Sequence, residues 1–194
     1  MRQHDGQHDA VYSDIHSARS IILAGLFGAL TAVGAVVTIP LPWTPVPFSL
    51  QVLFVLLSGI VLGGKLGAMS QAIYIILGVI GLPVFSGGHA GPGVLVGPTG
   101  GYLLGFVVAP LVVSMVAGRG RREGTWSGLK DFAGTLLGVV VIYIFGASQL
   151  ALVANLTPSR AISLGVLPFI AGDVVKAFLA TWLARHLRRR GLVL

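Results

Sequence analysis

Six apolar runs dominate the chain and limit what it can fold into. They cover residues 20–39, 49–63, 66–82, 100–118, 131–154 and 161–187. A helix needs about 20 residues to cross the hydrocarbon core of a bilayer, with a range of roughly 17–25. The second run falls short of that length, and we expect it to borrow residues from the Pro-rich segment before it. The runs predict an all-α integral membrane protein with six transmembrane helices.

The composition excludes several other classes of protein. Hydrophobic residues make up 55% of the chain and charged residues only 10%, whereas a soluble domain has about 25% charged residues. These values argue against a soluble enzyme, a disordered chain and a nucleic-acid-binding domain. Cysteine is absent, which excludes disulfides, thiolate catalysis and Cys-based zinc sites.

The positive charges predict the orientation of the helices. Six spans place both termini on one side of the membrane. Of the 13 Lys and Arg residues, only Arg160 falls on the opposite side, and Lys176 lies within a run. The remaining cations are Arg2, Arg19, Lys65, Arg119, Arg121, Arg122, Lys130, Arg185, Arg188, Arg189 and Arg190. Because cytoplasmic loops are enriched in Lys and Arg, we expect both termini in the cytoplasm. We divide the chain into a polar tail (1–19), a membrane domain (20–187) and a basic tail (188–194).

Asp173 and Lys176 are the strongest candidates for a ligand site. Each charge in the middle of a membrane helix costs about 2.5–3.5 kcal/mol on insertion scales. Their spacing of three residues places both on one helical face, where they can pair. A structural ion pair is the alternative, but two apolar residues would avoid the cost altogether. A carboxylate beside an ammonium suits a small ligand that has N–H donors and an anionic or carbonyl end.

Two uncharged loops would lie on the outer side, at residues 39–48 and 83–99. Both are rich in Pro or Gly, and irregular backbone at membrane depth is tolerated where it lines a cavity. At the start of the fourth run, residues 97–103 read GPTGGYL, which offers free N–H groups and close backbone approach to a polar ligand. The candidate ligand contacts there are Gly97, Pro98, Thr99, Gly100, Gly101 and Tyr102. The alternatives are stiff connectors and a simple capped helix start at Thr99.

Several polar residues within the runs give weaker signals. Gln51 and Tyr74 could line a pocket or could satisfy backbone groups, and the same holds for Gln71 and Gln149. His4 and His8 could bind a metal weakly, but a mobile polar segment is favoured there, and we expect no metal site.

Residues 59–66 read GIVLGGKL, which fits part of a phosphate-binding loop but has Leu in place of its Ser or Thr. The segment also follows an apolar helix rather than a strand. We therefore expect that this chain neither binds nor hydrolyses ATP. If transport needs ATP, partner subunits would have to use it.

Small residues recur every four positions in the first run, at Ala24, Gly28 and Ala32, with Gly25 and Ala29 on an adjacent stripe. Small residues let another helix approach closely. The partner helix could belong to this chain or to another subunit, and the pattern alone favours an internal one.

Five segments resemble the BioY family, the substrate-binding S components of energy-coupling-factor (ECF) biotin transporters. They are ALTAVGA (29–35), IPLPWTPVPFSLQ (39–51), LGVIGLPVFSGG (77–88), GPTGGYLLGF (97–106) and LPFIAGDVVKAFLA (167–180). They occur in the family's order and spacing, and the resemblance covers residues 24–187. Gln149 departs from the pattern, since an apolar or aromatic residue is expected near that position.

The resemblance implies a six-helix S-component fold that binds biotin near the outer surface. It also implies two kinds of partner, a transmembrane coupling subunit and two ATPase subunits, in the cell membrane of a bacterium or archaeon. In the family the small-residue face of the first helix docks on the coupling subunit, which implies that role for Ala24, Gly28 and Ala32. We hypothesise that Asp173 accepts a ureido N–H of biotin and that Lys176 orients Asp173 or binds a ligand oxygen. With this resemblance, residues 97–102 and 85–88, including Phe85, Gly87 and Gly88, are expected to cover the bicyclic ring.

Other readings stay open at this point. The chain could be an S component for another small vitamin, such as thiamine or riboflavin. It could be a membrane scaffold that binds no small molecule. A membrane enzyme is disfavoured, because no His, Ser or metal cluster lies near Asp173 and Lys176 in the sequence. Apart from Asp131 at the end of the fifth run, the runs also hold no second carboxylate.

Overall fold

The computed structural model describes residues 3–117 and 125–190, and the side chains of residues 18–117 and 127–190. Helices make up most of it, as the sequence predicts. They are α1 (Gln3–Val36), α2 (Gln51–Val61), α3 (Gly64–Val79), α4 (Gly93–Val96), α5 (Gly100–Ala117), α6 (Thr125–Val153), α7 (Pro158–Gly165) and α8 (Ile170–Arg189). Two short strands, β1 (Thr38–Ile39) and β2 (Phe48–Ser49), and a 3-10 turn, η1 (Ser86–Gly88), lie between them.

Each apolar run contains a helix, but the helices differ in length. Among the described residues, three helical segments are long and apolar enough to cross a membrane: Ala18–Val36, Gly100–Ala117 and Ser127–Val153. The helices α2 and α3 are apolar but shorter. The helix α1 begins at Gln3 and so includes most of the polar segment. The side chains of residues 1–17, with His4 and His8, lie outside the described residues.

The sixth apolar run is broken. It contains α7 and α8, which meet at an angle of 56° and together could form a fourth span. Pro168 lies in the break between them, where its ring and missing N–H prevent one continuous helix. The first turn of α8 therefore follows a bend, and Asp173 belongs to that turn.

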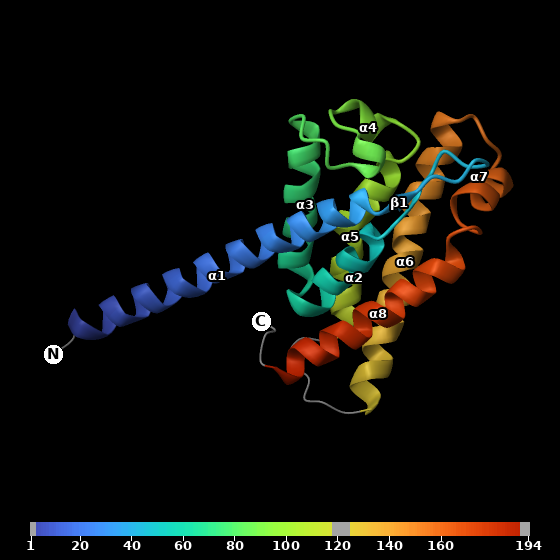
Figure 1. Ribbon diagram of the computed structural model, residues 1–194. Coiled ribbons are helices and arrows are strands. Elements are labelled where there is room, and N and C mark those ends of the chain that lie inside the picture. The colour runs from blue at the N-terminus through green and yellow to red at the C-terminus, as the bar shows by residue number, and fades with distance from the viewer. Residues whose placement is uncertain (1–2, 118–124, 191–194) are drawn as a thin grey trace.

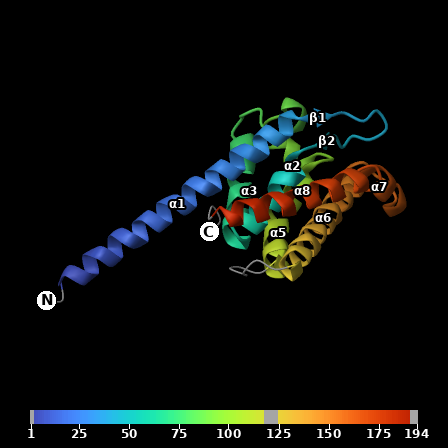
Figure 2. The same cartoon turned by 60° about the horizontal axis from the view of Figure 1, so that its bottom comes forward.

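The helix α2 is the centre of the molecule. Nearly all of its residues are buried, as expected for a helix that is hydrophobic all around its circumference. It packs against α1, α3, α5 and α8, and Figures 1 and 2 show it enclosed by them from two directions. In both views α1 leaves the bundle at its N-terminal end, and α8 runs obliquely across the outside of the bundle.

The helices α5 and α6 form the most extensive helix pair in the fold. Glycines on their facing sides allow the close contact: a Cβ at Gly105 would lie 2.9 Å from the Cα of Ile142, and one at Gly138 would lie 2.7 Å from a methyl of Val113. Small residues at such interfaces are typical of helix packing in membranes.

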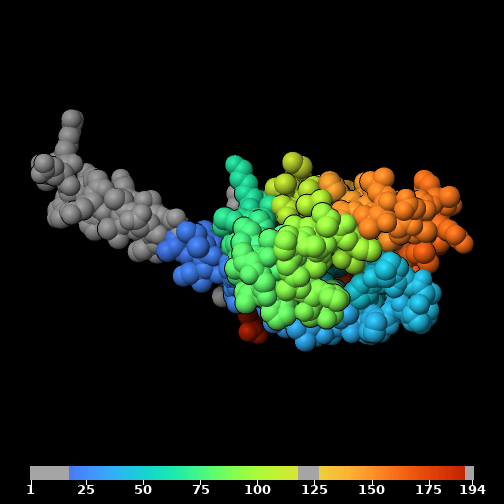
Figure 3. Space-filling model, turned by 90° about the horizontal axis from the view of Figure 1, so that it is seen from above, coloured from blue at the N-terminus to red at the C-terminus, as the bar shows by residue number. Residues whose placement is uncertain are grey.

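The loops at residues 39–48 and 83–99, which we call the outer loops after the side predicted for them from the sequence, gather at one end of the bundle. The strands β1 and β2 pair antiparallel, with Thr38 opposite Ser49 and Ile39 opposite Phe48, so the Pro-rich loop between them projects from that end. Viewed from above, this loop (light blue) and the Gly-rich segment after α3 (green) lie beside each other around a recess (Figure 3).

Candidate ligand-binding site

A cavity of about 600 Å³ lies beneath the two outer loops. Its wall comes from four parts of the chain: residues 38–52, residues 85–106, Ile142 and Tyr143 of α6, and the segment from Phe169 to Lys176. Most of the lining residues are apolar. Asp173 is the single acidic residue among them, and Lys176 and His89 are the basic ones.

Asp173 and Lys176 form a buried ion pair in the cavity wall. The Nζ atom of Lys176 lies 2.7 Å from Oδ1 of Asp173, and the two residues are 4% and 3% exposed. Tyr143 of α6 donates its hydroxyl to Oδ2 of Asp173 at 2.7 Å. The pairing predicted from their spacing is confirmed, and both residues border the cavity.

The ammonium of Lys176 is also held by an aromatic ring. Its Nζ lies 3.7 Å from the centroid of the Phe48 ring, a cation–π arrangement that stabilises a desolvated charge. Phe48 itself stacks on Phe169 with centroids 6.4 Å apart. A Cβ at Gly172 would collide with the Phe48 ring, so the glycine before Asp173 makes room for this stack. Sequence reasoning missed Phe48 and Tyr143, because nothing local distinguishes them from other aromatic residues.

Asp173 keeps unused capacity to accept hydrogen bonds. An ionised carboxylate offers about four lone-pair positions, and within the described part of the chain Lys176 and Tyr143 fill two of them. The remaining positions are available to N–H donors of a ligand in the cavity. The net charge of the pair is zero, so the site suits a neutral group with N–H donors better than an anion.

Gln51 joins both outer loops to the helices. Its Nε2 donates to the hydroxyl of Tyr74 at 2.5 Å, and its Oε1 accepts from Ser49 at 2.9 Å and from Ser86 at 2.5 Å. The Tyr74 hydroxyl in turn donates to the carbonyl of Val84 at 3.1 Å. Gln51 borders the cavity and Tyr74 does not. Tyr74 therefore supports a loop. Gln51 also supports the loops and, in addition, forms part of the cavity wall.

The segment 97–102 divides between cavity and packing. Gly97, Pro98, Thr99 and Tyr102 line the cavity, as expected. Gly100 and Gly101 do not, contrary to the expectation, because α5 turns them away: a Cβ at Gly101 would collide with the Phe145 carbonyl of α6, and one at Gly100 would collide with the Leu95 carbonyl. These two glycines permit close packing at the start of α5.

The turn at residues 85–89 also splits. Phe85 and Gly87 line the cavity, whereas Gly88 does not. Phe85 is 2% exposed and meets the Tyr74 ring edge-on, with centroids 5.7 Å apart. Gly87 and Gly88 have φ angles of 77° and 76°, a left-handed conformation that favours glycine. Gly88 therefore shapes the turn rather than the wall.

Gln149 has a clear structural role that the sequence did not reveal. Its Nε2 donates to the carbonyls of Leu95 and Gly97, at 2.7 and 2.8 Å. The side chain thereby fixes α4 and the residues before α5 to α6. An amide inside an apolar helix must find a hydrogen-bond partner. The sequence therefore indicated that Gln149 makes a hydrogen bond, but it could not identify the acceptors.

The small-residue stripe of α1 faces inward. Ala24 is fully buried, and a Cβ at Gly28 would lie 2.9 Å from the Ser70 carbonyl of α3. Ala32 packs half-buried against the core. Gly28 therefore packs against α3 of the same chain and Ala24 is buried in this conformation, whereas the docking of this stripe on a coupling subunit stays a prediction.

The adjacent stripe of small residues on α1 faces outward. A Cβ at Gly25 would meet nothing within 4 Å, and Ala29 is exposed. The two stripes are one residue apart in the sequence, so only the packing of α1 on α3 decides which of them is free.

Within the described part of the chain, no group of three or more His, Asp or Glu side chains is placed to hold a metal ion.

Comparison with known proteins gives the family. The BioY family model matches residues 6–192. A Pyrococcus horikoshii protein described as a probable biotin transporter BioY is 43% identical over 171 residues, which cover 88% of this chain and 97% of the relative. The biotin transporter BioY of Thermotoga maritima is 42% identical over 171 residues, with coverages of 88% and 96%.

A solved structure agrees. It is described as the S-component for biotin from an ECF-type ABC transporter, and it matches with a TM-score of 0.79 and 26% identity over 90% of this chain and 93% of that one. The resemblance noted from the sequence motifs is therefore confirmed, and the chain belongs to the BioY family.

Proposed function

We propose that this chain is the membrane subunit that captures biotin from the outer side of the cell membrane. It would deliver the vitamin inward together with an ECF coupling subunit and two ATPase subunits. Three observations support this: the family match, the biotin transporters among the relatives, and the similar S-component structure. The observation that carries the proposal is the buried carboxylate of Asp173, which borders a mostly apolar cavity and has unused positions to accept hydrogen bonds.

The chemistry of biotin matches this cavity. Its ureido ring has two N–H donors and a carbonyl, its bicyclic ring and chain are apolar, and its far end is a carboxylate. In this proposal Asp173 accepts a ureido N–H, and Lys176 orients Asp173 or contacts a ligand oxygen. The loop residues Phe85, Gly87 and Gly97–Tyr102 cover the ring, with Gly100 and Gly101 contributing through packing.

We further propose a topology of six spans with both termini in the cytoplasm. The shorter helices α2 and α3 and the bent pair α7–α8 would each cross, and the tails at 1–19 and 188–194 would lie on the inner side. The distribution of Lys and Arg supports this orientation. The relatives come from an archaeon and a bacterium, which fits a multi-pass protein in the cell membrane of such an organism.

The outward stripe of α1, rather than the buried one, would contact the coupling subunit. Gly25 and Ala29 lie there among exposed apolar residues such as Leu26. The energy for transport would come from ATP used by the partner subunits. In this chain Gly59 and Gly64, at the ends of the GIVLGG stretch, pack closely against α5, which favours a helix-to-helix turn over a nucleotide site.

The test is binding of biotin to the purified, detergent-solubilised chain and to Asp173→Asn. A hydrogen bond to a charged group contributes about 1.5–3 kcal/mol, so we expect Asp173→Asn to weaken biotin binding by roughly 10–100-fold. Lys176→Ala should weaken it too, because it leaves the carboxylate buried without its counter-charge.

Asp131→Asn is the matched control. Asp131 is also buried and ion-paired, to Arg188 at 2.6 Å, but it does not line the cavity. It should change thermal stability without a specific loss of biotin affinity. A folded Asp173→Asn variant with wild-type affinity would overturn the assignment, and binding of thiamine or riboflavin in place of biotin would overturn the choice of vitamin.

A further inference from the structure

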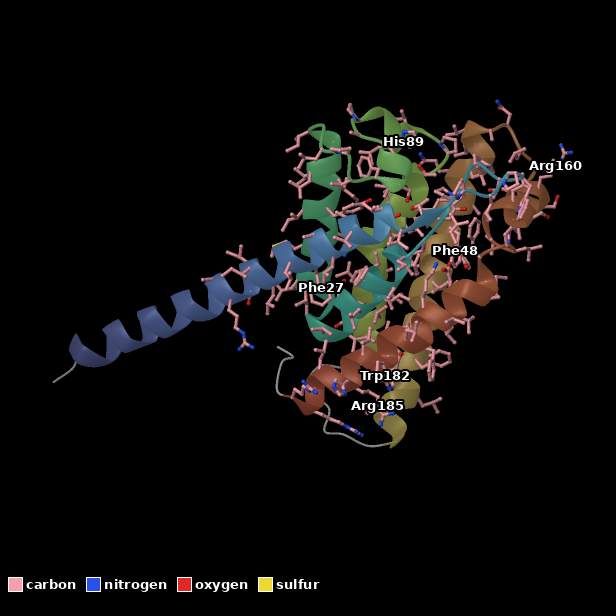
Figure 4. All side chains as sticks on the ribbon, viewed as in Figure 1. Phe27, Phe48, His89, Arg160, Trp182 and Arg185 are labelled. Carbon is pink, nitrogen blue, oxygen red and sulfur yellow. The ribbon has the colours of Figure 1, made fainter. Side chains whose placement is uncertain are left out.

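His89 is the one cavity residue whose ionisable side chain is left without an assigned role. It is exposed and follows η1 in the loop after α3. Figure 4 shows it at the outer end of the molecule, above Phe48, the residue whose ring holds the Lys176 ammonium. The same cavity is bordered by His89 and by Lys176, so a ligand that fills it can reach both.

The Asp173–Lys176 end of the cavity is poorly suited to an anion. The ammonium of Lys176 is already neutralised by Asp173 at 2.7 Å and rests on an aromatic ring. A ligand carboxylate placed there would also face the Asp173 carboxylate. The charged end of a ligand whose neutral, N–H-bearing end binds Asp173 must therefore point elsewhere.

The hydroxyl groups near the outer loops are mostly engaged. Ser49 and Ser86 donate to Oε1 of Gln51, and Thr38 donates to the carbonyl of Ala35. Farther in, Tyr102 donates its hydroxyl to the carbonyl of Gly165, and Tyr143 donates its hydroxyl to Asp173. These five hydroxyl protons are not available to a carboxylate without breaking bonds inside the protein.

The His89 imidazole, in contrast, makes no hydrogen bond or ion pair through its ring within the described residues. The turn beneath it is well fixed: Phe85 N–H donates to the His89 carbonyl at 3.1 Å, and Gly88 N–H donates to the Phe85 carbonyl at 3.0 Å. The ring lies over Gly87, with Nε2 3.4 Å from the place of a Cβ. A side chain at Gly87 would crowd the ring, so the glycine lets the imidazole lie beside the cavity wall.

We infer that His89 binds the carboxylate of the ligand at the outer end of the cavity and makes the site selective for the acid over its neutral derivatives. This inference rests on the proposed function, which assigns a contact to the ureido end of the ligand, and it adds a contact for the carboxylate end. An imidazole N–H donates to a carboxylate whether or not the ring is charged, and the protonated ring adds an ionic contribution.

The test compares biotin with biotinamide, which has the same rings and chain but a neutral end. Both dissociation constants are measured by titration calorimetry for the detergent-solubilised full chain and for His89→Leu and His89→Lys. We expect His89→Leu to weaken biotin about tenfold, as the loss of one charge-assisted hydrogen bond does. Biotinamide should change less than about twofold, and His89→Lys should restore the preference for biotin.

Arg160→Leu is the matched control, because Arg160 is an exposed cation at the same end of the molecule (Figure 4) but does not line the cavity. It should leave both constants unchanged. An equal loss for both ligands in His89→Leu, or no loss for biotin, would overturn the inference while leaving the proposed function intact. A folded wild-type chain that binds neither ligand would overturn both.

Discussion

The polar residues inside the apolar runs were visible in the sequence, but their partners were not. Asp173 and Lys176 are three residues apart, so their pairing could be predicted from helix geometry. Gln149, in contrast, donates to carbonyls 52 and 54 residues away. Gln51 bonds to Ser49 nearby but also to Tyr74 and Ser86, which are 23 and 35 residues away. Sequence can therefore select the residues that must have partners in a membrane, and only the fold separates ligand contacts from loop supports.

At the residue scale, Gln149→Leu tests whether the support of the Gly97 segment matters for holding the ligand. The change removes both hydrogen bonds to the Leu95 and Gly97 carbonyls, each with a net contribution of about 0.5–1.5 kcal/mol. We expect biotin to dissociate several-fold faster, because the segment that lines the cavity, and that would cover the ligand in the proposed site, opens more easily. The measurement is the release of radiolabelled biotin after dilution.

Gln71→Leu is the control for this change. Gln71 is fully buried on α3, its Oε1 has no hydrogen-bond partner among the described residues, and it does not line the cavity. Its replacement should leave the dissociation rate of biotin unchanged. Equal rates for Gln149→Leu and the wild type would show that the Gln149 hydrogen bonds do not restrain the loop.

At the scale of whole helices, the two small-residue stripes of α1 differ only in which one meets α3. A helix rotates by about 100° per residue, so stripes one position apart face different directions. Both stripes repeat small residues every four positions, Ala24, Gly28 and Ala32 in one and Gly25 and Ala29 in the other, so the spacing alone could not assign the internal and external faces. The fold assigns Ala24 and Gly28 to the interior and Gly25 and Ala29 to the exterior.

A pair of valine substitutions separates the two faces. Gly28→Val places a side chain against the Ser70 carbonyl, and overpacking of this kind costs about 1–3 kcal/mol, so the thermal midpoint of unfolding should fall. Gly25→Val meets open space, so unfolding and biotin binding should stay near wild type. Its copurification with the co-expressed coupling and ATPase subunits should be lost.

The reverse pattern would refute this assignment. If Gly25→Val still copurified with those subunits at wild-type yield, the outward stripe would not be the docking surface. The same measurement on Gly28→Val, at a temperature where it is folded, shows whether loss of assembly follows from instability alone.

At the scale of the whole molecule, the apolar runs located the helices but not their bends or the cavity. Most helix ends lie within a few residues of the run ends, because burial in lipid or protein requires an apolar sequence. Three features differ from the runs: the break at Pro168, the start of α1 at Gln3 and the start of α6 at Thr125. Hydropathy shows neither a bend within an apolar run nor the continuation of a helix into polar sequence. The cavity wall combines four distant parts of the chain, so its shape depended on tertiary packing.

The topology is the feature of the whole molecule that remains to be tested, and the absence of Cys makes single-cysteine labelling direct. Lys65, Lys130 and Arg160 are exposed, and each can be replaced by Cys in turn. In intact cells a membrane-impermeant maleimide should label Arg160→Cys, because the positive-inside rule places that loop outside. Lys65→Cys and Lys130→Cys should react only after the membrane is opened.

The comparison of positions 65 and 160 is decisive for the shorter helices. Apart from the four-residue α4, three helices (α3, α5 and α6) separate these positions, so a chain in which all three cross the bilayer places them on opposite sides. If α3, which is shorter than a typical span, only dipped into the membrane, positions 65 and 160 would react from the same side. Position 130, one helix from 160, would still react from the other side. That result would replace six spans with a smaller number while leaving the cavity and its chemistry unchanged.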